Sequence, residues 1–211
     1  APDGSVYVVE NWNSRIQKFT SEGVFVRKWG SIGSGDGQFS HPSGIAVASD
    51  GSVYVADSAN YRIQKFTSDG VFVSKWGSHG TGDEQFDWPI SVAVASGGSV
   101  YVADNNNDRI QKFTSGGGFV IKWGIEGTGD GQFNSPRGIA VAPDGSLYVA
   151  ETWNDRVQRF TSEGVFAFKW GTNGSGDGQF QKPDGISVAP DGKLYVGDRD
   201  NDRIQKFSVG P

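Results

Sequence analysis

The sequence predicts an all-β fold made of stacked copies of one 47-residue unit. An Arg-Ile-Gln-Lys-Phe run, or a close variant of it, recurs every 47 residues without insertion or deletion, and its arginines are Arg15, Arg62, Arg109, Arg156 and Arg203. The 211 residues also include 32 glycines and only 8 prolines, which indicates many tight turns between short strands. Because no segment shows the 3.6-residue apolar stripe of a helix, we expect strands and turns throughout.

Each unit contains four short segments of β-branched or alternating apolar character. In the first complete copy they are residues 45–48, 53–56, 62–66 and 72–76. Turn sequences that contain Gly51 and Gly70 separate these segments. Glycine adopts positive φ without steric cost, so such turns suit tight antiparallel connections. One unit is therefore predicted to form a four-stranded antiparallel sheet.

A unit of this length buries too little apolar surface to fold alone, so the copies must pack on one another. Four-stranded sheets of this size are typical of the blades of a β-propeller, which are arranged around an axis. The fourth segment ends in tryptophan in four copies, at Trp29, Trp76, Trp123 and Trp170. We expect each indole to pack between neighbouring blades.

The repeat boundaries predict a single propeller domain over residues 1–211, with about four and a half blades. Residues 1–30 form a partial blade, residues 44–90, 91–137 and 138–184 form full repeats, and residues 185–208 form a second partial blade. The first partial blade lacks the innermost strand and the last lacks the outermost. Because such edges leave backbone groups unpaired, we expect self-association through the incomplete terminal blades into a closed ring of more than one chain.

An acidic residue precedes each recurring arginine by five positions, across the turn between the second and third segments. These acids are Glu10, Asp57, Asp104, Glu151 and Asp198. We expect exposed ion pairs that contribute about 0 to 1 kcal/mol each and mainly shape the turn.

The residues that carry a family resemblance recur in every copy and cover essentially the whole chain. Runs such as residues 138–145 (Gly-Ile-Ala-Val-Ala-Pro-Asp-Gly), 147–150 and 154–160 resemble NHL repeats. The resemblance implies a propeller that usually has six blades. It also implies partner binding on the face that carries the connections between blades and between the second and third strands, and it slightly favours an extracytoplasmic location. Six repeats of this period need about 282 residues, so the 211 residues depart from that pattern.

The copies differ from one another mainly in the two connections on that face, where several aromatic and charged residues stand off the packing pattern. The candidate binding residues are Trp12, His41, Tyr61, Trp88, Arg137, Trp153, Lys182 and Arg199. Exposed aromatic residues are enriched where proteins bind partners. The sequence therefore predicts a non-enzymatic interaction module for a protein or carbohydrate-like partner. A structural, amplified or engineered scaffold is the alternative, and an RNA-binding NHL domain is the lesser one.

Other classes of function find little support in the sequence. We expect no catalytic residue, cofactor or metal site, because His41 and His79 occupy unrelated repeat positions and no cysteine is present. Nucleic acid is an unattractive partner, since the net charge is −5 and most basic residues occupy template positions of the repeat. No apolar stretch is long enough for a membrane helix, which predicts a soluble chain without membrane contact.

Overall fold

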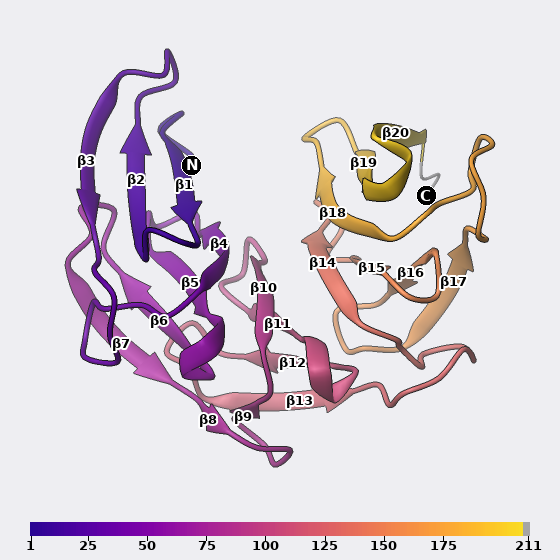
Figure 1. Ribbon diagram of the computed structural model, residues 1–211, viewed down its shortest axis with the longest axis horizontal. Helices are drawn as coiled ribbons and strands as arrows, with labels where there is room; N and C mark the ends of the chain where they lie inside the picture. The colour runs from indigo at the N-terminus through magenta and orange to yellow at the C-terminus, as the bar shows by residue number, and fades with distance from the viewer. Residues whose placement is uncertain (209–211) are drawn as a thin grey trace.

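The computed structural model describes residues 1–208 and shows five antiparallel sheets arranged as an open arc (Figure 1). Blade 1 contains β1 (Val6–Glu10), β2 (Arg15–Phe19) and β3 (Phe25–Trp29). Blade 2 contains β4 (Pro42–Val47), β5 (Val53–Asp57), β6 (Arg62–Phe66) and β7 (Phe72–Trp76). Blade 3 contains β10 (Pro89–Val94), β11 (Val100–Asp104), β12 (Arg109–Phe113) and β13 (Phe119–Trp123). Blade 4 contains β14 (Pro136–Val141), β15 (Leu147–Glu151), β16 (Arg156–Phe160) and β17 (Phe166–Trp170), and blade 5 contains β18 (Pro183–Val188), β19 (Lys193–Asp198) and β20 (Arg203–Ser208).

The predicted β-propeller is confirmed, with four-stranded antiparallel blades in the middle of the chain and three-stranded blades at both ends. In blade 2, β5 and β6 pair from Val53 with Phe66 to Asp57 with Arg62. Successive side chains of a strand point to opposite faces of the sheet. Every residue of β5 is nevertheless buried, because blades 1 and 3 cover the two faces of blade 2.

Blade-to-blade packing uses the same residues at each interior boundary. Ile16 of blade 1 packs against Val53, Val55 and Phe66 of blade 2, and all four side chains are fully buried. Burying such aliphatic and aromatic side chains contributes about 1.5 to 3 kcal/mol each. These interfaces are therefore the main source of stability for the scaffold that carries the loops.

The recurring tryptophans lie between neighbouring blades, as the sequence predicts. The ring centroid of Trp29 is 6.0 Å from that of Phe66 in the next blade and 6.1 Å from that of Tyr7 in its own. A Cβ atom on Gly70 of blade 2 would lie 2.5 Å from the indole, which explains the glycine there. The indole Nε1 atom is buried without a partner among residues 1–208, so part of the gain from burying the ring is lost.

The connections between blades contribute core residues that sequence reasoning missed. Each connection is hydrogen-bonded to the blade that follows it and inserts a fully buried phenylalanine, at Phe39, Phe86, Phe133 and Phe180. In the second connection this produces a short parallel pair, β8 (Ser78–His79) with β9 (Gln85–Phe86), and the other connections have a single bridge at the same place. These phenylalanines fill the space beside the third strand and anchor each connection.

The two ends of the arc lie on opposite sides of an opening (Figure 1). At the blade 1 end, Val6 and Val8 are 47% and 41% exposed, whereas the equivalent Val53 and Val55 of blade 2 are fully buried. At the blade 5 end, Ile204 is 73% exposed, although the equivalent Ile63 is fully buried. Each terminal blade thus presents one uncovered half of the interior blade interface.

Candidate partner-binding rim

Two kinds of connection meet at one face of the arc. The rim loops join the second and third strands of blades 2 to 5 and the equivalent strands β1 and β2 of blade 1, and they comprise residues 11–14, 58–61, 105–108, 152–155 and 199–202. Three of them contain a single 3-10 turn, namely η1 (Ser58–Asn60), η2 (Asn105–Asn107) and η3 (Arg199–Asn201). The crossovers join successive blades and comprise residues 30–41, 77–88, 124–135 and 171–182.

In blades 2 to 5 a buried carboxylate group ties the rim loop to the crossover that precedes it. Asp57 accepts hydrogen bonds from Arg62 Nε at 2.7 Å, from Asn60 at 2.9 Å and from the backbone N–H of Ser40 at 2.7 Å. Gln64 adds a further bond to the same carboxylate at 3.0 Å. One carboxylate therefore organises the rim loop, the third strand and the end of the crossover.

The guanidinium group of Arg62 secures the rest of the crossover. It donates to the backbone carbonyls of Ser34, Gly35 and Gln38 at 2.7 to 2.9 Å. The side chains of Asp57 and Arg62 are 0% and 7% exposed. The expectation of exposed pairs that only shape a turn is therefore wrong for the interior blades, because the crossover covers the pair and its carbonyls satisfy the remaining donors.

The last residue of each crossover has left-handed backbone geometry. These residues are His41, Trp88, Ser135 and Lys182, with φ between +50° and +58°. Positive φ is uncommon outside glycine, so the surrounding hydrogen bonds must hold it. In two blades an aspartate of the preceding rim loop does so, since Asp108 accepts from the Ser135 N–H at 2.7 Å and Asp155 from the Lys182 N–H at 2.8 Å.

The first residue of the rim loop in blades 1 to 4 also reaches the next blade. Ser58 Oγ donates to the carbonyl of Pro89 at 2.7 Å, and Thr152 Oγ1 donates to that of Pro183 at 2.9 Å. Asn11 and Asn105 make the same contact with the following proline through their side-chain amides. The rim loops of blades 2 to 4 are consequently fixed on both sides, and those of blades 1 and 5 are each fixed on one side, so their remaining side chains are displayed at defined positions.

The fixed loops place rim-loop residues and crossover residues alternately around this face. We call this series the rim, and in order it comprises Trp12, His41, Ala59, Trp88, Asn106, Ser135, Trp153, Lys182 and Asp200. The backbone N–H of Ala59, Asn106, Trp153 and Asp200 each donates to the crossover of the same blade. Side-chain contacts across the blade boundaries join the rim further, as between Trp12 and His41.

One half of the rim is aromatic. The rings of Trp12 and His41 meet edge to face with centroids 5.4 Å apart, and the centroids of His41 and Trp88 are 6.2 Å apart. Ala59 stands between the last two in the series, and its small side chain leaves room for their approach. The indole of Trp12 is 88% exposed, which makes it the most exposed large hydrophobic side chain among those described.

The other half of the rim is charged. Lys182 Nζ lies 2.7 Å from Asp200 Oδ2 and 5.3 Å from the ring centroid of Trp153. Arg199 Nε bonds the same aspartate at 3.0 Å. The hydrogen bond from Lys182, followed by that from Arg199, lowers the pKa of Asp200, so this carboxylate is ionised at neutral pH. The charges on this half are largely satisfied within the chain.

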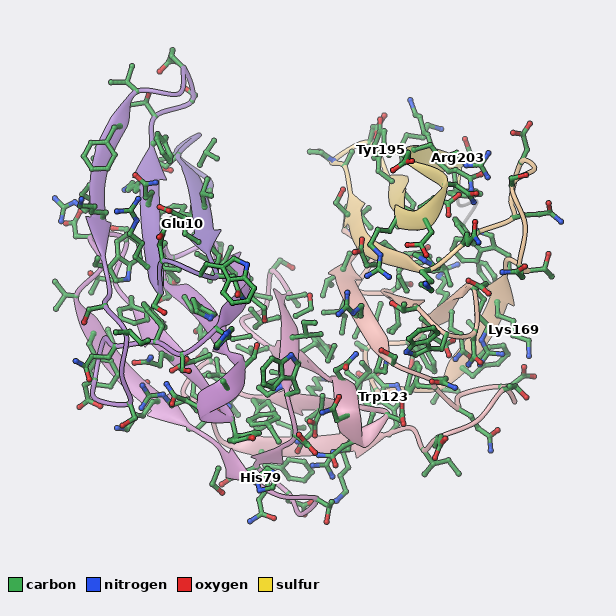
Figure 2. The ribbon with its side chains drawn as sticks, in the orientation of Figure 1. Glu10, His79, Trp123, Lys169, Tyr195 and Arg203 are labelled. Carbon is green, nitrogen blue, oxygen red and sulfur yellow. The ribbon has the colours of Figure 1, made fainter. Side chains whose placement is uncertain are left out.

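The predicted binding residues divide into two groups in the structure. Trp12, His41, Trp88, Trp153, Lys182 and Arg199 lie together on the rim and its loops. Arg137 is the second residue of β14 and lies just inside the rim, with its guanidinium 4.0 Å from Asp184. Tyr61 instead packs against His79, with ring centroids 4.4 Å apart, and His79 is the last residue of β8 at the outer edge of the arc (Figure 2).

Sequence reasoning missed the role of two aspartates. Neither Asp184 nor Asp200 was among the predicted binding residues, yet each stands between two basic side chains on or beside the rim. The signal was present, because both residues occupy repeat positions that vary from copy to copy.

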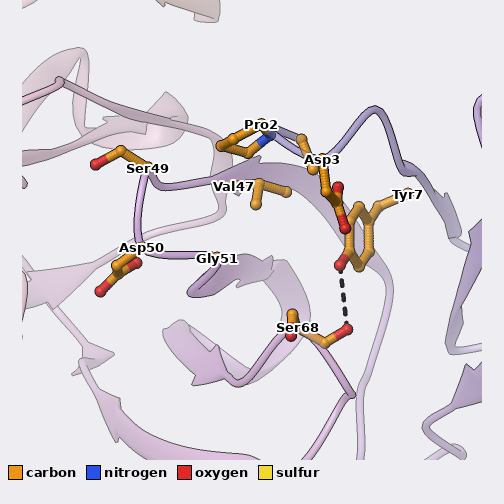
Figure 3. A pocket seen from close by; sticks show the side chains of 9 residues that line it. Pro2, Asp3, Tyr7, Val47, Ser49, Asp50, Gly51 and Ser68 are labelled. Atoms are coloured by element: carbon orange, nitrogen blue, oxygen red, sulfur yellow. Dashed lines mark hydrogen bonds between the residues drawn. The ribbon is translucent and has the colours of Figure 1, made fainter.

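The opposite face of the arc carries turns that differ little between copies. There Asp3 and Asp50 border a hollow of about 200 Å³ (Figure 3). Beside it, the hydroxyl group of Tyr7 donates to the carbonyl of Ser68 at 3.1 Å. A second hollow, of about 340 Å³, has apolar walls built from equivalent residues of three blades, which include Val94, Val141 and Val188. These surfaces repeat scaffold residues and offer less varied chemistry than the rim.

Among residues 1–208, no three His, Cys, Asp or Glu side chains are grouped so that they would hold a metal ion. Over the same residues, no helix has the length and apolar character needed to cross a membrane.

The fold and its repeated residues agree with one family of repeats. The NHL repeat model matches residues 39–66, 86–113, 133–160 and 180–207. The chain therefore belongs to the NHL-repeat family. No curated protein matches the sequence.

Solved structures with the same fold share little sequence with the chain. A streptogramin B lyase is 18% identical with a TM-score of 0.70, and the match covers 100% of this chain and 67% of that one. A catalytically inactive virginiamycin B lyase from Staphylococcus aureus, solved with quinupristin, is 21% identical with a TM-score of 0.69, covering 97% of this chain and 66% of that one. A structure of a nidogen/laminin complex gives 16% identity and a TM-score of 0.71, covering 96% and 73%. The chain thus spans about two thirds of the length of the two lyases, and these similarities establish the fold alone.

Proposed function

We propose that this chain is a non-enzymatic interaction module that binds a protein partner on the rim. The observation that carries the proposal is the contrast between two sets of residues on the same loops. The hydrogen-bonding residues that hold the loops recur in the interior blades, as Asp57 and Arg62 do at Asp104 and Arg109. The displayed residues instead vary between blades and include exposed aromatic side chains, which are common in binding sites.

A similar fold in a nidogen/laminin complex supports a protein partner, since that propeller belongs to an assembly of proteins. The proposal also retains the extracytoplasmic location that the family resemblance favours. An enzyme is the second candidate function, because the lyases have the same fold. Against it stands the environment of His41, whose ring contacts two indoles and whose Nδ1 atom has no hydrogen-bond partner among the described residues. A general base needs an orienting partner and a reacting group within reach.

The rim can be tested against an equally apolar surface on the other face. Trp12→Ser with Trp153→Ser removes two exposed rim indoles, and Val71→Ser with Val165→Ser removes two side chains that are similarly exposed on turns between third and fourth strands. Photo-crosslinking in an extract of the source organism, followed by binding measurements with the purified partner, should show loss of binding for the first pair only.

Equal loss of binding for both pairs, or no protein bound at micromolar concentration, would contradict the proposal. Binding of a glycan array through the rim would favour the carbohydrate-like alternative. Tight binding of RNA that weakens steeply with salt would favour the RNA-binding alternative. A chain that binds none of these would fit the scaffold alternative.

We further propose that chains of these 211 residues associate head to tail, with a second copy as the partner. The uncovered Ile204 face of blade 5 and the uncovered Val6 and Val8 face of blade 1 are complementary halves of the interior blade interface. Sedimentation at tens of micromolar should give a mass above that of one chain. Ile204→Lys should restore the monomer, while Val71→Lys, at an exposed position on a turn, should not. A monomeric parent chain at that concentration would refute this association.

A further inference from the structure

We propose that the aromatic half of the rim, formed by Trp12, His41 and Trp88, receives a lysine or arginine side chain of the protein partner. This inference rests on the proposed function and names the chemistry of that same site. It comes from a comparison within the molecule. The repeat places two equivalent tryptophans on the rim, and a cationic side chain of this chain lies beside only one of them.

The two copies are Trp12 with His41 and Trp153 with Lys182. The members of each pair occupy the same repeat positions, three repeats apart. In the second copy, the ammonium group of Lys182 lies 5.3 Å from the ring centroid of Trp153, within the range of a cation–π interaction. Asp200 then holds that ammonium group at 2.7 Å. The loop geometry of the repeat therefore accommodates a cation beside an indole at this position.

The first copy has the indole but lacks the cation. His41 stands where the lysine would be, and Ala59 stands where Asp200 would hold it. The indole of Trp12 is 88% exposed, against 60% for Trp153. More of its electron-rich surface thus remains open to an incoming group.

Two of the three rings stand on anchored backbone before a partner arrives, and the third packs against one of them. His41 and Trp88 both have left-handed backbone geometry, with φ of +50° and +58°, at the ends of anchored crossovers. Trp12 meets the His41 ring edge to face at an interplanar angle of 74°. Because the backbone of His41 and Trp88 is already fixed, less conformational entropy is lost when a cation binds.

The basic side chains on and just inside the rim belong to the other half, and each has an acidic neighbour. Lys182 pairs with Asp200, while Arg199 and Arg137 lie 3.9 Å and 4.0 Å from Asp184. The aromatic half therefore favours a cation supplied from outside, and the paired charges of the other half do not compete for it.

The test follows the indole N–H resonances of Trp12 and Trp153 by NMR, each assigned from its loss in a Trp→Phe variant. The probes are N-acetyl-lysine methylamide and its uncharged isostere, N-acetyl-norleucine methylamide. We expect the lysine probe to shift the Trp12 signal and to bind about two- to fivefold more tightly than the norleucine probe, the ratio expected for an exposed cation–π contact. The Trp153 signal should respond much less, because Lys182 already lies against that ring.

Two double variants exchange the copies. His41→Lys with Ala59→Asp builds the internal lysine and its aspartate beside Trp12, and it should abolish the Trp12 response while the indole stays. Lys182→His with Asp200→Ala removes them beside Trp153, and that indole should then respond to the lysine probe. Circular dichroism of each variant checks that the propeller is intact.

The inference is overturned if the two probes bind Trp12 equally, if neither shifts it, or if Trp153 responds equally in the parent chain. A stronger response to methyl glucoside would also overturn it, in favour of sugar stacking. The crosslinking comparison of the rim with the opposite face is independent of these probes. A rim that binds its protein partner but ignores lysine would refute only this inference.

Discussion

Ile63 in blade 2 and Ile204 in blade 5 occupy the same position of the repeat, yet the first is fully buried and the second is 73% exposed. Blade 3 covers Ile63, whereas among residues 1–208 no further blade follows blade 5 to cover Ile204. The same local sequence therefore contributes very differently to the free energy of unfolding. Packing between blades, rather than the intrinsic preference of each unit, decides what a residue contributes.

The ion pairs repeat this contrast. In blade 2 the crossover covers Asp57 and Arg62, and its carbonyls accept three hydrogen bonds from the arginine. In blade 1 the corresponding Arg15 bonds Glu10 at 2.6 Å and is 31% exposed. Figure 2 labels Glu10, which belongs to the ion pair of blade 1, and Arg203, which belongs to the equivalent ion pair of blade 5 at the other end of the arc. The ion pair therefore anchors a crossover only in blades where a crossover lies over the pair.

The largest expected effect is at this buried pair. Asp57→Ala leaves the guanidinium group of Arg62 without its carboxylate partner and should destabilise the fold by about 3 to 5 kcal/mol. Glu10→Ala in blade 1 should cost clearly less, because water reaches Arg15. Chemical denaturation of both variants measures the difference, and equal losses would show that burial of the pair is unimportant.

The next effect separates interior packing from the end face. Ile63→Ala should lower the free energy of unfolding by about 2 to 5 kcal/mol, the usual cost of truncating a buried aliphatic side chain. Ile204→Ala should change it by less than about 0.5 kcal/mol in the monomer, as for an ordinary surface substitution. Urea titration at low protein concentration tests this. A large loss at Ile204 would mean that the end face is covered in solution.

A smaller effect is expected at two glycines with the same backbone. Gly23 and Gly70 have φ of +81° and +76°, but only a Cβ atom on Gly70 would meet another residue, the indole of Trp29 at 2.5 Å. Gly23→Ala should cost about 1 to 2 kcal/mol from the left-handed backbone alone. Gly70→Ala should cost about 1 to 3 kcal/mol more because it also overpacks the indole. Similar melting temperatures for the two variants would argue against the close approach of Trp29.

The smallest effect concerns pH. Hydrogen bonds from Arg15, and then from Asn13, lower the pKa of Glu10 to about 2 from an ordinary value of 4.5. The stabilisation this implies is present above about pH 4.5 and is lost as the pH falls toward 2, because the unfolded chain takes up the proton first. Glu10→Gln should therefore flatten the decline of stability over that range. An unchanged pH profile would show that Glu10 is not held by Arg15.

Much of the fold was predictable because the repeat restates it in every copy. The segments expected at residues 62–66 and 72–76 are β6 and β7, and Trp76 packs against Phe113 of the next blade, as expected for a wedge. The buried Phe86 was not predicted, because it follows a glycine-rich connection that has no strand periodicity of its own. Its burial depends on the crossover packing against the following blade, blade 3.

The candidate site was predictable in part. Variation between copies singled out Trp12 and Trp153, and the structure places both on one rim. It did not reveal that the Tyr61 ring packs against His79 at the outer edge, because the same loop sequence would also allow the ring to lie on the rim. It also gave no sign that Asp184 stands beside Arg137, since residues one repeat apart meet only through the packing of blades.

The chain's own repetition determined the strands, the turns and the radial arrangement, because side-chain alternation and glycine placement act over a few residues and recur in each unit. Only the tertiary structure decided which copies are covered, which ion pairs are buried and which rim residues touch. Those outcomes depend on contacts between residues one or more repeats apart. Two chemically identical positions can therefore differ in free energy when their neighbours differ.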